Sequence, residues 1–283
     1  MTTSTVTKVT KTPLRLAVST WSLHRTLGDP QIYGPDTNQI PVNTHGRGAL
    51  SLLEVPTRIA RAGIHALEIC HFHLPSIDAN YLHQVRAAAE QAQVEIWNLL
   101  IDAGDPVHPQ DAARDEAWIA QWLDVAHELG TKRVRVIAGK QSPTAKTLQH
   151  SRDALLRLAD KAEPHGIRVL TENWFETAST PDAVHELMRT TEGRIGLLFD
   201  FGNWKGATKH ADLAQIAQYA ESCHCKPQFH ADGSIEPSDY TRCFDIVHTA
   251  GFSGPFSLIY DGPNDDEFAG LAAEKAIAET YLK

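Results

Sequence analysis

Three side chains of the kinds that bind metal ions close three successive apolar segments of the chain. Glu172 stands near the end of GIRVLTEN, Asp200 ends GRIGLLFD, and His224 lies within SCHCKP. Taken singly, such residues are more typical of a helix cap, a turn and a hydrogen-bonded core histidine. Their recurrence at consecutive strand ends favours one shared site. Two carboxylates and an imidazole suit Mn²⁺, Mg²⁺, Co²⁺ or Zn²⁺, so the pattern predicts a site for one divalent metal ion.

The elements that must position these residues form eight repeats, each a short apolar segment followed by an amphipathic one. Helical spacing of apolar residues predicts helices such as 111–129 and 151–163, and a glycine precedes the next strand in ELG, PHG and TAG, as a helix stop should. The predicted strands are LRLAVST (14–20), HALEICH (65–71), VEIWNLLID (94–102), TKRVRVIAG (131–139), GIRVLTEN (166–173), GRIGLLFD (193–200), SCHCKP (222–227) and GPFSLIYD (254–261).

Eight strand–helix units in 283 residues predict an α/β fold, a (β/α)₈ TIM barrel. The rival architecture is a doubly wound open sheet. No glycine-rich phosphate loop follows the first strand, where VSTWSLHR stands instead, and this counts against the rival. Active sites of such barrels lie at the carboxyl ends of the strands, which is where the three metal-binding residue types fall.

The chain is expected to consist of a short tail and one barrel domain. Residues 1–13 are rich in Thr and Lys, lack the apolar core of a signal peptide and are predicted to be a flexible tail. Residues 14–283 form the predicted barrel. The loop 28–48 is long and rich in Gly, Pro and Asn. Because it follows the first strand it would lie over the barrel mouth, as a lid or, equally, as a simple insertion.

Composition and charge narrow the class of partner. The net charge is −9 and there is no basic run, which disfavours nucleic acid and therefore an endonuclease function. No stretch approaches the roughly 20 apolar residues of a membrane span, so no membrane partner is expected. The four scattered cysteines predict no disulfide framework and favour a reduced, cytoplasmic protein. The oligomeric state is open, with a homo-oligomer among the alternatives.

Several motifs are similar to those of a known family. TEN (171–173), FDFGNW (199–204), STWSLHR (19–25) and the segment from HCKPQFHADG to AGFSG (224–254) resemble the sugar phosphate isomerase/epimerase family of xylose-isomerase-like TIM barrels. The resemblance covers nearly the whole chain after about residue 14 and is densest in the C-terminal half. It is more specific for the superfamily than for any one substrate.

This resemblance implies a metal-dependent enzyme acting on a small carbohydrate. Members hold one divalent metal ion through a Glu, an Asp, a His and a second Glu, and the two glutamates move protons beside a carbonyl. Carried over by position, Glu172, Asp200 and His224 are the first three ligands, and Glu172 is also the catalytic base. A Lewis-acidic metal ion and an adjacent carboxylate base are a chemically consistent pair for this reaction.

The eighth predicted strand departs from the family pattern. It reads SLIYDG where the family usually has Ser-x-Glu-Tyr-Glu-Gly, so Ile259 stands at the position of the second glutamate. Isoleucine neither binds a metal ion nor transfers a proton. Strand alternation puts Asp261 on the same face two residues further on, as a catalytic candidate that reaches the substrate, or the metal through a water. Lys226 is a candidate for stabilising a developing oxyanion, with a solvated lysine as the alternative.

Six further side chains are candidates for substrate binding. Tryptophan rings stack on the apolar faces of sugars, although most tryptophans are simply packed. Arg135 would meet a substrate carboxylate or phosphate, or close an internal ion pair. His230 would replace a missing acid or base. The six candidates are Trp21, His24, His71, Arg135, Trp174 and His230.

Three functions follow from these residues. The first is a divalent-metal-dependent sugar isomerase or epimerase that abstracts a proton next to a carbonyl of a sugar or sugar derivative. The second is a dehydratase or other lyase that acts on a keto-sugar, cyclitol or glycoside with the same metal site; Ile259 counts against it less than against an epimerase, which usually needs acid/base groups on two faces. The third is a non-catalytic sugar-binding barrel with a degraded site.

Overall fold

The strands close into a barrel, as predicted. The computed structural model describes residues 13–30, 33–36 and 45–282. All eight strands are parallel and run in sequence order around the barrel, which closes where β1 pairs with β8. The strands are β1 Arg15–Ser19, β2 Ala66–Cys70, β3 Glu95–Ile101, β4 Arg133–Val136, β5 Arg168–Glu172, β6 Gly196–Asp200, β7 Ala220–Cys225 and β8 Pro255–Leu258.

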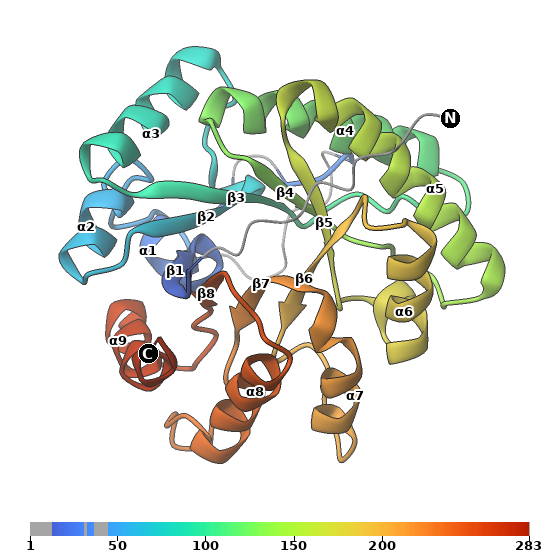
Figure 1. The fold of residues 1–283 in the computed structure, drawn as a ribbon. Coiled ribbons are helices and arrows are strands. Elements are labelled where there is room, and N and C mark those ends of the chain that lie inside the picture. Colours follow the sequence, from blue (N-terminus) through green and yellow to red (C-terminus); the bar gives the residue numbers. More distant parts are fainter. Residues whose placement is uncertain (1–12, 31–32, 37–44, 283) are drawn as a thin grey trace.

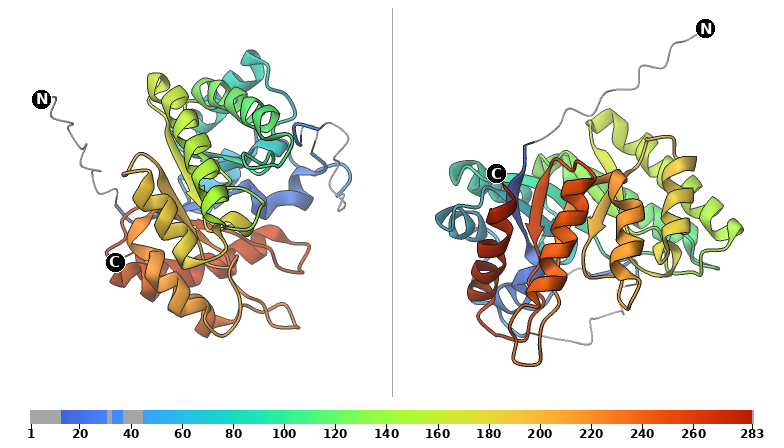
Figure 2. Two further views of the ribbon diagram at one scale, coloured as in Figure 1. Left: turned by 90° about the vertical axis from the view of Figure 1, so that its right-hand side faces the viewer. Right: turned by 60° about the horizontal axis from the view of Figure 1, so that its bottom comes forward.

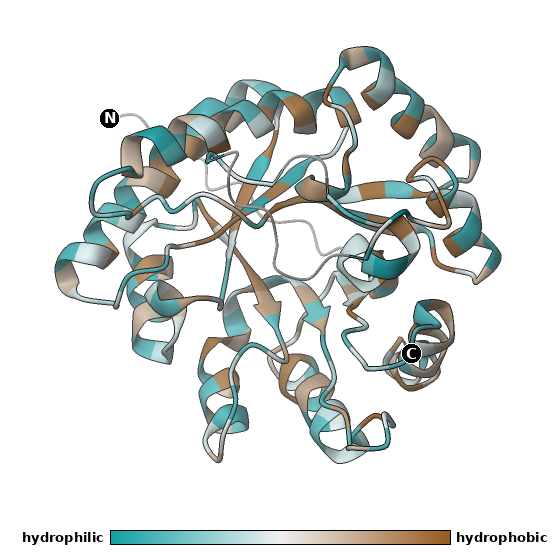
Figure 3. Ribbon diagram, turned by 180° about the vertical axis from the view of Figure 1, so that it is seen from behind, coloured by the Kyte–Doolittle hydropathy of each residue, from teal (hydrophilic) through white to brown (hydrophobic). Residues whose placement is uncertain are grey.

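Helices surround the strands on the outside (Figure 1), and the two further views in Figure 2 show the same enclosing layer. Apolar side chains of strands and inner helix faces meet between the two layers, which is why the strands are largely apolar and the outer helices are mixed in hydropathy (Figure 3). The helices are α1 His24–Leu27, α2 Val55–Arg61, α3 Ala79–Gln91, α4 Ala112–Leu129, α5 Ala145–Ala162, α6 Pro181–Thr190, α7 Lys209–Ile216, α8 Pro237–Thr249 and α9 Glu267–Ala278.

Several predicted element boundaries were wrong by a few residues, and for two of them the structure shows the reason. The helix expected over 151–163 begins earlier, at Ala145, because the Thr144 side chain accepts a hydrogen bond from the Thr147 N–H and caps it. The eighth strand, expected over 254–261, ends at Leu258. There the Ser22 hydroxyl donates to the Leu258 carbonyl and accepts from the Tyr260 N–H, so a side chain takes the place of the strand pairing.

Most of the predicted tail and part of the loop 28–48 fall outside the described residues. These are residues 1–12 of the tail, and 31–32 and 37–44 of the loop. The two ends of the loop 28–48 meet at an antiparallel bridge between Gly28 and Arg47. A Cβ on Gly28 would lie 2.3 Å from the backbone nitrogen of Gly48, so only glycine permits this close approach. No helix in the described ranges is long and apolar enough to cross a membrane.

Candidate active site

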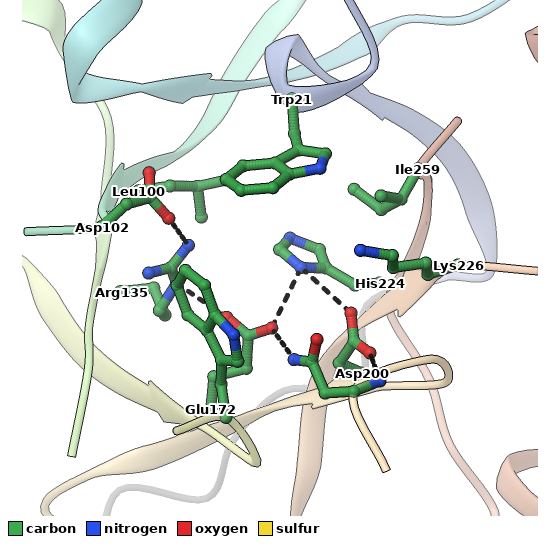
Figure 4. Close-up of a pocket in the computed structure, with 11 residues that line it drawn as sticks. Trp21, Leu100, Asp102, Arg135, Glu172, Asp200, His224, Lys226 and Ile259 are labelled. Atoms are coloured by element: carbon green, nitrogen blue, oxygen red, sulfur yellow. Dashed lines mark hydrogen bonds and ion pairs between the residues drawn. The ribbon is translucent and has the colours of Figure 1, made fainter. Parts of the chain in front are cut away.

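The three predicted metal ligands lie together at the barrel mouth. Glu172 and Asp200 are the last residues of β5 and β6, and His224 lies near the end of β7. The His224 Nδ1 atom is 3.5 Å from Glu172 Oε1 and 3.8 Å from Asp200 Oδ2 (Figure 4). One ligand atom of each residue lies within 4.8 Å of the other two, and all three side chains are buried. The strand-end pattern in the sequence therefore corresponds to one site.

The second ring nitrogen of His224 is held by a carboxylate from the opposite side of the barrel. His224 Nε2 is 2.9 Å from Glu68 Oε2, and Asn98 Nδ2 donates to the other oxygen of Glu68 at 3.3 Å. Glu68 is fully buried in β2. Carboxylates in this position fix the ring orientation of metal-binding histidines and leave the other nitrogen free to bind a metal ion. Glu68 thus aims Nδ1 at the two other candidate ligands.

Asp200 is oriented by backbone amides of the turn that follows it. Its Oδ1 accepts hydrogen bonds from the N–H groups of Gly202 and Asn203, at 2.7 and 2.6 Å. The Asp200 N–H donates to Asn173 Oδ1 at 2.7 Å, and Asn173 Nδ2 donates to the Asp200 carbonyl at 3.0 Å. Gly202 is required here because a Cβ would lie 2.8 Å from the Lys226 side chain. Oδ2 is left facing His224.

Glu172 is fixed by a buried arginine, Arg135. The Arg135 Nε atom is 2.9 Å from Glu172 Oε2, and its Nη2 donates to Asp102 Oδ1 at 2.5 Å. Arg135 is only 2% exposed, so the pairing is an internal ion pair. On the other side, Asn203 Nδ2 donates to Glu172 Oε1 at 2.9 Å. A side chain held at both oxygens is pre-organised for chemistry.

The charges of the three candidate ligands depend strongly on one another. Burial opposes ionisation of Glu172, but Arg135 and then His224 outweigh it and keep its pKa below the ordinary value. Burial and the neighbouring Glu172 raise the pKa of Asp200 to about 6. Burial alone would lower the pKa of His224, yet Glu68 and Glu172 raise it to about 10. Positive charge is therefore favoured at the position between these carboxylates.

A divalent metal ion suits these residues. They offer two carboxylate oxygens and one imidazole nitrogen, which is the donor mixture of Mn²⁺, Mg²⁺, Co²⁺ and Zn²⁺ sites. A bound metal ion would take the place of a proton on His224 Nδ1, the nitrogen that faces Glu172 and Asp200. Among the described residues, this group supplies three ligands, and Ile259 in the lining of the same cavity offers no ligand atom.

Ile259 lines the cavity over the three ligands, on the side where Lys226 also lies (Figure 4). This cavity, the metal pocket, encloses about 70 Å³, and its aromatic walls are Trp21 and Trp174, whose ring centroids are 6.1 Å apart. Asp261 does not line it. Its carboxylate is about half exposed and pairs with Lys226 Nζ at 2.6 Å. The predicted role of Asp261 in reaching the substrate stays a prediction.

The remaining predicted substrate contacts separate into three groups. Trp21, Trp174 and Arg135 line the metal pocket. His24 lines a neighbouring cavity instead. His71 is fully buried behind the pocket, where its Nδ1 accepts from the Asp102 N–H at 3.2 Å, and His230 is exposed beside Glu236. The structure therefore does not bring these last two side chains to the metal pocket.

Three supporting residues were missed as site residues in the sequence. Glu68 lies within the second predicted strand without any metal-ligand pattern around it, whereas its partner is His224 on the seventh. Asp102 ends the third predicted strand, which is the same signal that identified Asp200. Asn203 lies in the FDFGNW motif but carries no metal-ligand signature of its own. Partners that meet across the barrel leave no spacing pattern along the chain.

A second group of metal-binding residue types lies between α7 and α8, away from the barrel mouth. It consists of His210, Asp239 and Cys243. The Lys209 ammonium already donates to both oxygens of Asp239, at 2.8 and 2.6 Å. A fixed positive charge at the carboxylate opposes a metal ion there. This group therefore offers a control rather than a rival site.

The chain belongs to the family described as xylose isomerase-like TIM barrel, whose sequence model matches residues 56–280. The same architecture is found in a xylose isomerase-like TIM barrel protein from Mycobacterium smegmatis in complex with magnesium (TM-score 0.68, 14% identity, 95% of this chain and 96% of that one). Among curated proteins no match is found.

Two further solved structures carry different activities on this fold. One is the D-allulose 3-epimerase from Methylomonas sp. (TM-score 0.68, 13% identity, 96% of this chain and 99% of that one). The other is the probable 3-DHS dehydratase AsbF from Bacillus anthracis (TM-score 0.65, 15% identity, 93% of this chain and 98% of that one). At these identities the comparison shows the shared fold and leaves the reaction to the site.

Proposed function

We propose that this protein is a divalent-metal-dependent enzyme of the sugar isomerase or epimerase type, which abstracts a proton next to a carbonyl of a sugar or sugar derivative. The observation that carries the proposal is the preformed group of Glu172, Asp200 and His224, with each side chain held in place by a neighbour. The magnesium complex of a protein with the same fold supports the choice of metal class. Carbohydrate as substrate class is supported by the named epimerase.

Two residues on different sides of the metal pocket transfer protons in this proposal: Glu172 accepts a proton and Lys226 donates one. When bound, a divalent metal ion would supply Lewis-acid polarisation of a substrate oxygen. Glu172 is kept ionised by Arg135, so it can accept a proton from the carbon beside the carbonyl. Burial opposes the charge of Lys226, but Asp200 and Asp261 raise its pKa and keep an ammonium donor on the side of Ile259. Trp21 and Trp174 form the aromatic walls against which the substrate would pack.

A lyase is the second candidate, and Ile259 favours it. Epimerisation by two carboxylates is not available, because Ile259 occupies the wall where the second one would stand. Elimination needs one base and one acid that protonates the leaving group. Glu172 and the Lys226 ammonium, paired with Asp261 at 2.6 Å, supply that combination. The dehydratase that shares the fold is consistent with this chemistry.

Solvent deuterium exchange tests the proposal and separates the two reactions. The Mn²⁺-loaded protein is incubated in D₂O with a panel of keto-sugars and keto-glycosides, and substrates and products are analysed by mass spectrometry. Metal-dependent exchange is expected, with a loss of about 10²–10⁴-fold in Glu172→Gln. An isomer of unchanged composition identifies an isomerase or epimerase, whereas a product lacking water or an aglycone identifies a lyase. Sugar binding without any exchange would contradict both and leave a sugar-binding barrel.

A further inference from the structure

A second cavity adjoins the metal pocket and is about five times larger. It encloses about 380 Å³, compared with about 70 Å³ for the metal pocket, and Trp21 lines both. We infer that this side cavity binds an uncharged ring of the substrate, so that the substrates are glycosides with the reacting sugar at the metal and the aglycone ring in the side cavity. The inference rests on the proposed function. The lining residues that carry it are Trp21, His24, Tyr33, Phe72, Tyr260 and Asp261.

Ring-shaped side chains form much of the wall of the side cavity. The His24 ring stacks on Phe72 at a centroid distance of 5.5 Å and an interplanar angle of 6°. Tyr33 lies 5.8 Å from Phe72, and Trp21 meets His24 edge to face at 4.9 Å. Extended aromatic walls bind flat or chair-shaped rings through their apolar faces. The wall is thus suited to a sugar or aryl ring.

The charges at the side cavity argue against a phosphate group. Burial, and then the neighbouring His45, lower the pKa of His24, so its imidazole is neutral near pH 7. The Arg25 side chain is engaged by Asp265 at 3.2 Å and by Glu267 at 3.6 Å. Among the described lining residues, no other arginine or lysine is present to bind an anion. An uncharged substituent is therefore the better fit.

An unused hydrogen-bond donor lies where the two cavities meet. The Trp21 Nε1 atom is buried and has no acceptor among the described residues. In Figure 4 it is directed toward the side of Ile259 and Lys226. Lys226 lines the metal pocket and Asp261 lines the side cavity, and their ion pair of 2.6 Å joins the two. A substrate that spans both cavities would place its bridging oxygen beside these donors, as a glycosidic oxygen requires.

Calorimetric binding of unreactive glycosides tests this inference separately from turnover. The probes are methyl β-D-glucoside, phenyl β-D-glucoside and cellobiose, which share one sugar ring and lack a carbonyl group. We expect the phenyl glycoside, cellobiose or both to bind the Mn²⁺-loaded protein about tenfold more tightly than the methyl glycoside. The reason is that their second ring would pack against the aromatic wall of the side cavity. Tyr33→Ser should remove this advantage. Tyr81→Ser, a half-buried tyrosine on α3 that is absent from the side cavity, should retain it.

Each outcome decides the inference. An advantage for phenyl alone assigns an aryl ring, and one for cellobiose alone assigns a sugar ring. Equal affinity for the three probes, saturable binding of none, or an advantage that survives in Tyr33→Ser would overturn the inference. Thermal melting of both variants confirms that they are folded. Failure of the proposed function would be visible separately, as absent deuterium exchange while the difference in binding persists.

Discussion

Ile259 is the single residue that most limits the chemistry of the site. It is 2% exposed and lines the metal pocket, where its side chain offers neither a metal ligand nor an acid or base. Ile259→Glu should therefore bind Mn²⁺ at least about ten times more tightly than the native protein, because affinity grows with the number of charged ligands. Titration calorimetry measures this.

The matched control for that variant is Ile259→Gln, which has the same shape without the charge. If Ile259→Glu and Ile259→Gln bound Mn²⁺ equally tightly, a charged ligand would not be the cause of the tighter binding.

Asp261→Asn tests the other residue of this segment. It should weaken turnover while leaving Mn²⁺ affinity unchanged, because Asp261 contacts Lys226 and does not line the metal pocket. Unchanged turnover in Asp261→Asn would remove its proposed role.

Arg135 balances the charge of the buried acids at the site. It compensates two buried carboxylates, Asp102 and Glu172. Arg135→Met should lower the free energy of unfolding by about 3–5 kcal/mol, the usual cost of leaving a buried charge unpaired. Adding Asp102→Asn should recover part of the loss. In denaturant titrations, a loss below about 1 kcal/mol, or one equal to that of Arg133→Met on the same strand, would contradict this account.

Among the elements, helix α9 carries a buried glutamate, Glu274, whose carboxylate has no well-aligned hydrogen bond among the described residues. Glu274 is fully buried, and neither carboxylate oxygen has such a partner in the described chain. Burial raises its pKa well above 4.5, and the Ile259 N–H only partly offsets this. The folded state thus keeps a proton that the unfolded state releases, so the free energy of unfolding falls as pH rises above about 4.5.

Glu274→Gln should remove this dependence. Each pH unit between the two pKa values costs up to about 1.4 kcal/mol in the native protein. The variant is therefore expected to be more stable than the native protein at pH 7–8, with little difference near pH 4. Urea unfolding across pH measures it, with the exposed Glu279→Gln as control. An unaltered pH slope in Glu274→Gln would refute the role of Glu274.

The sequence predicts elements better than it predicts their ends. Alternating apolar and amphipathic segments suffice for the order of strands and helices, because each must bury one surface against the other layer. They do not suffice for the end of β8, which is set by the Ser22 hydroxyl from the far end of the chain. Strand alternation therefore does not extend to Asp261, whose carboxylate pairs with Lys226 and lies outside the lining of the metal pocket.

For the whole molecule, closure of the barrel is what turns separate residues into a site. Glu172, Asp200 and His224 were predictable because neighbouring strands deliver their ends to one mouth. Glu68 was not predictable as a partner of His224, since only closure brings β2 opposite β7. The same closure buries Arg135 with two acids, whereas its sequence context left a substrate contact equally open.

The most direct test of the account is the number of Mn²⁺ ions bound per chain, measured by titration calorimetry. We predict one ion for the native protein and an affinity at least about 100-fold weaker in Asp200→Asn, since an oriented ligand is lost. Asp239→Asn, in the group of His210, Asp239 and Cys243, should bind as the native protein does. Native-like binding by Asp200→Asn, or loss of binding in Asp239→Asn, would contradict a metal site at the barrel mouth.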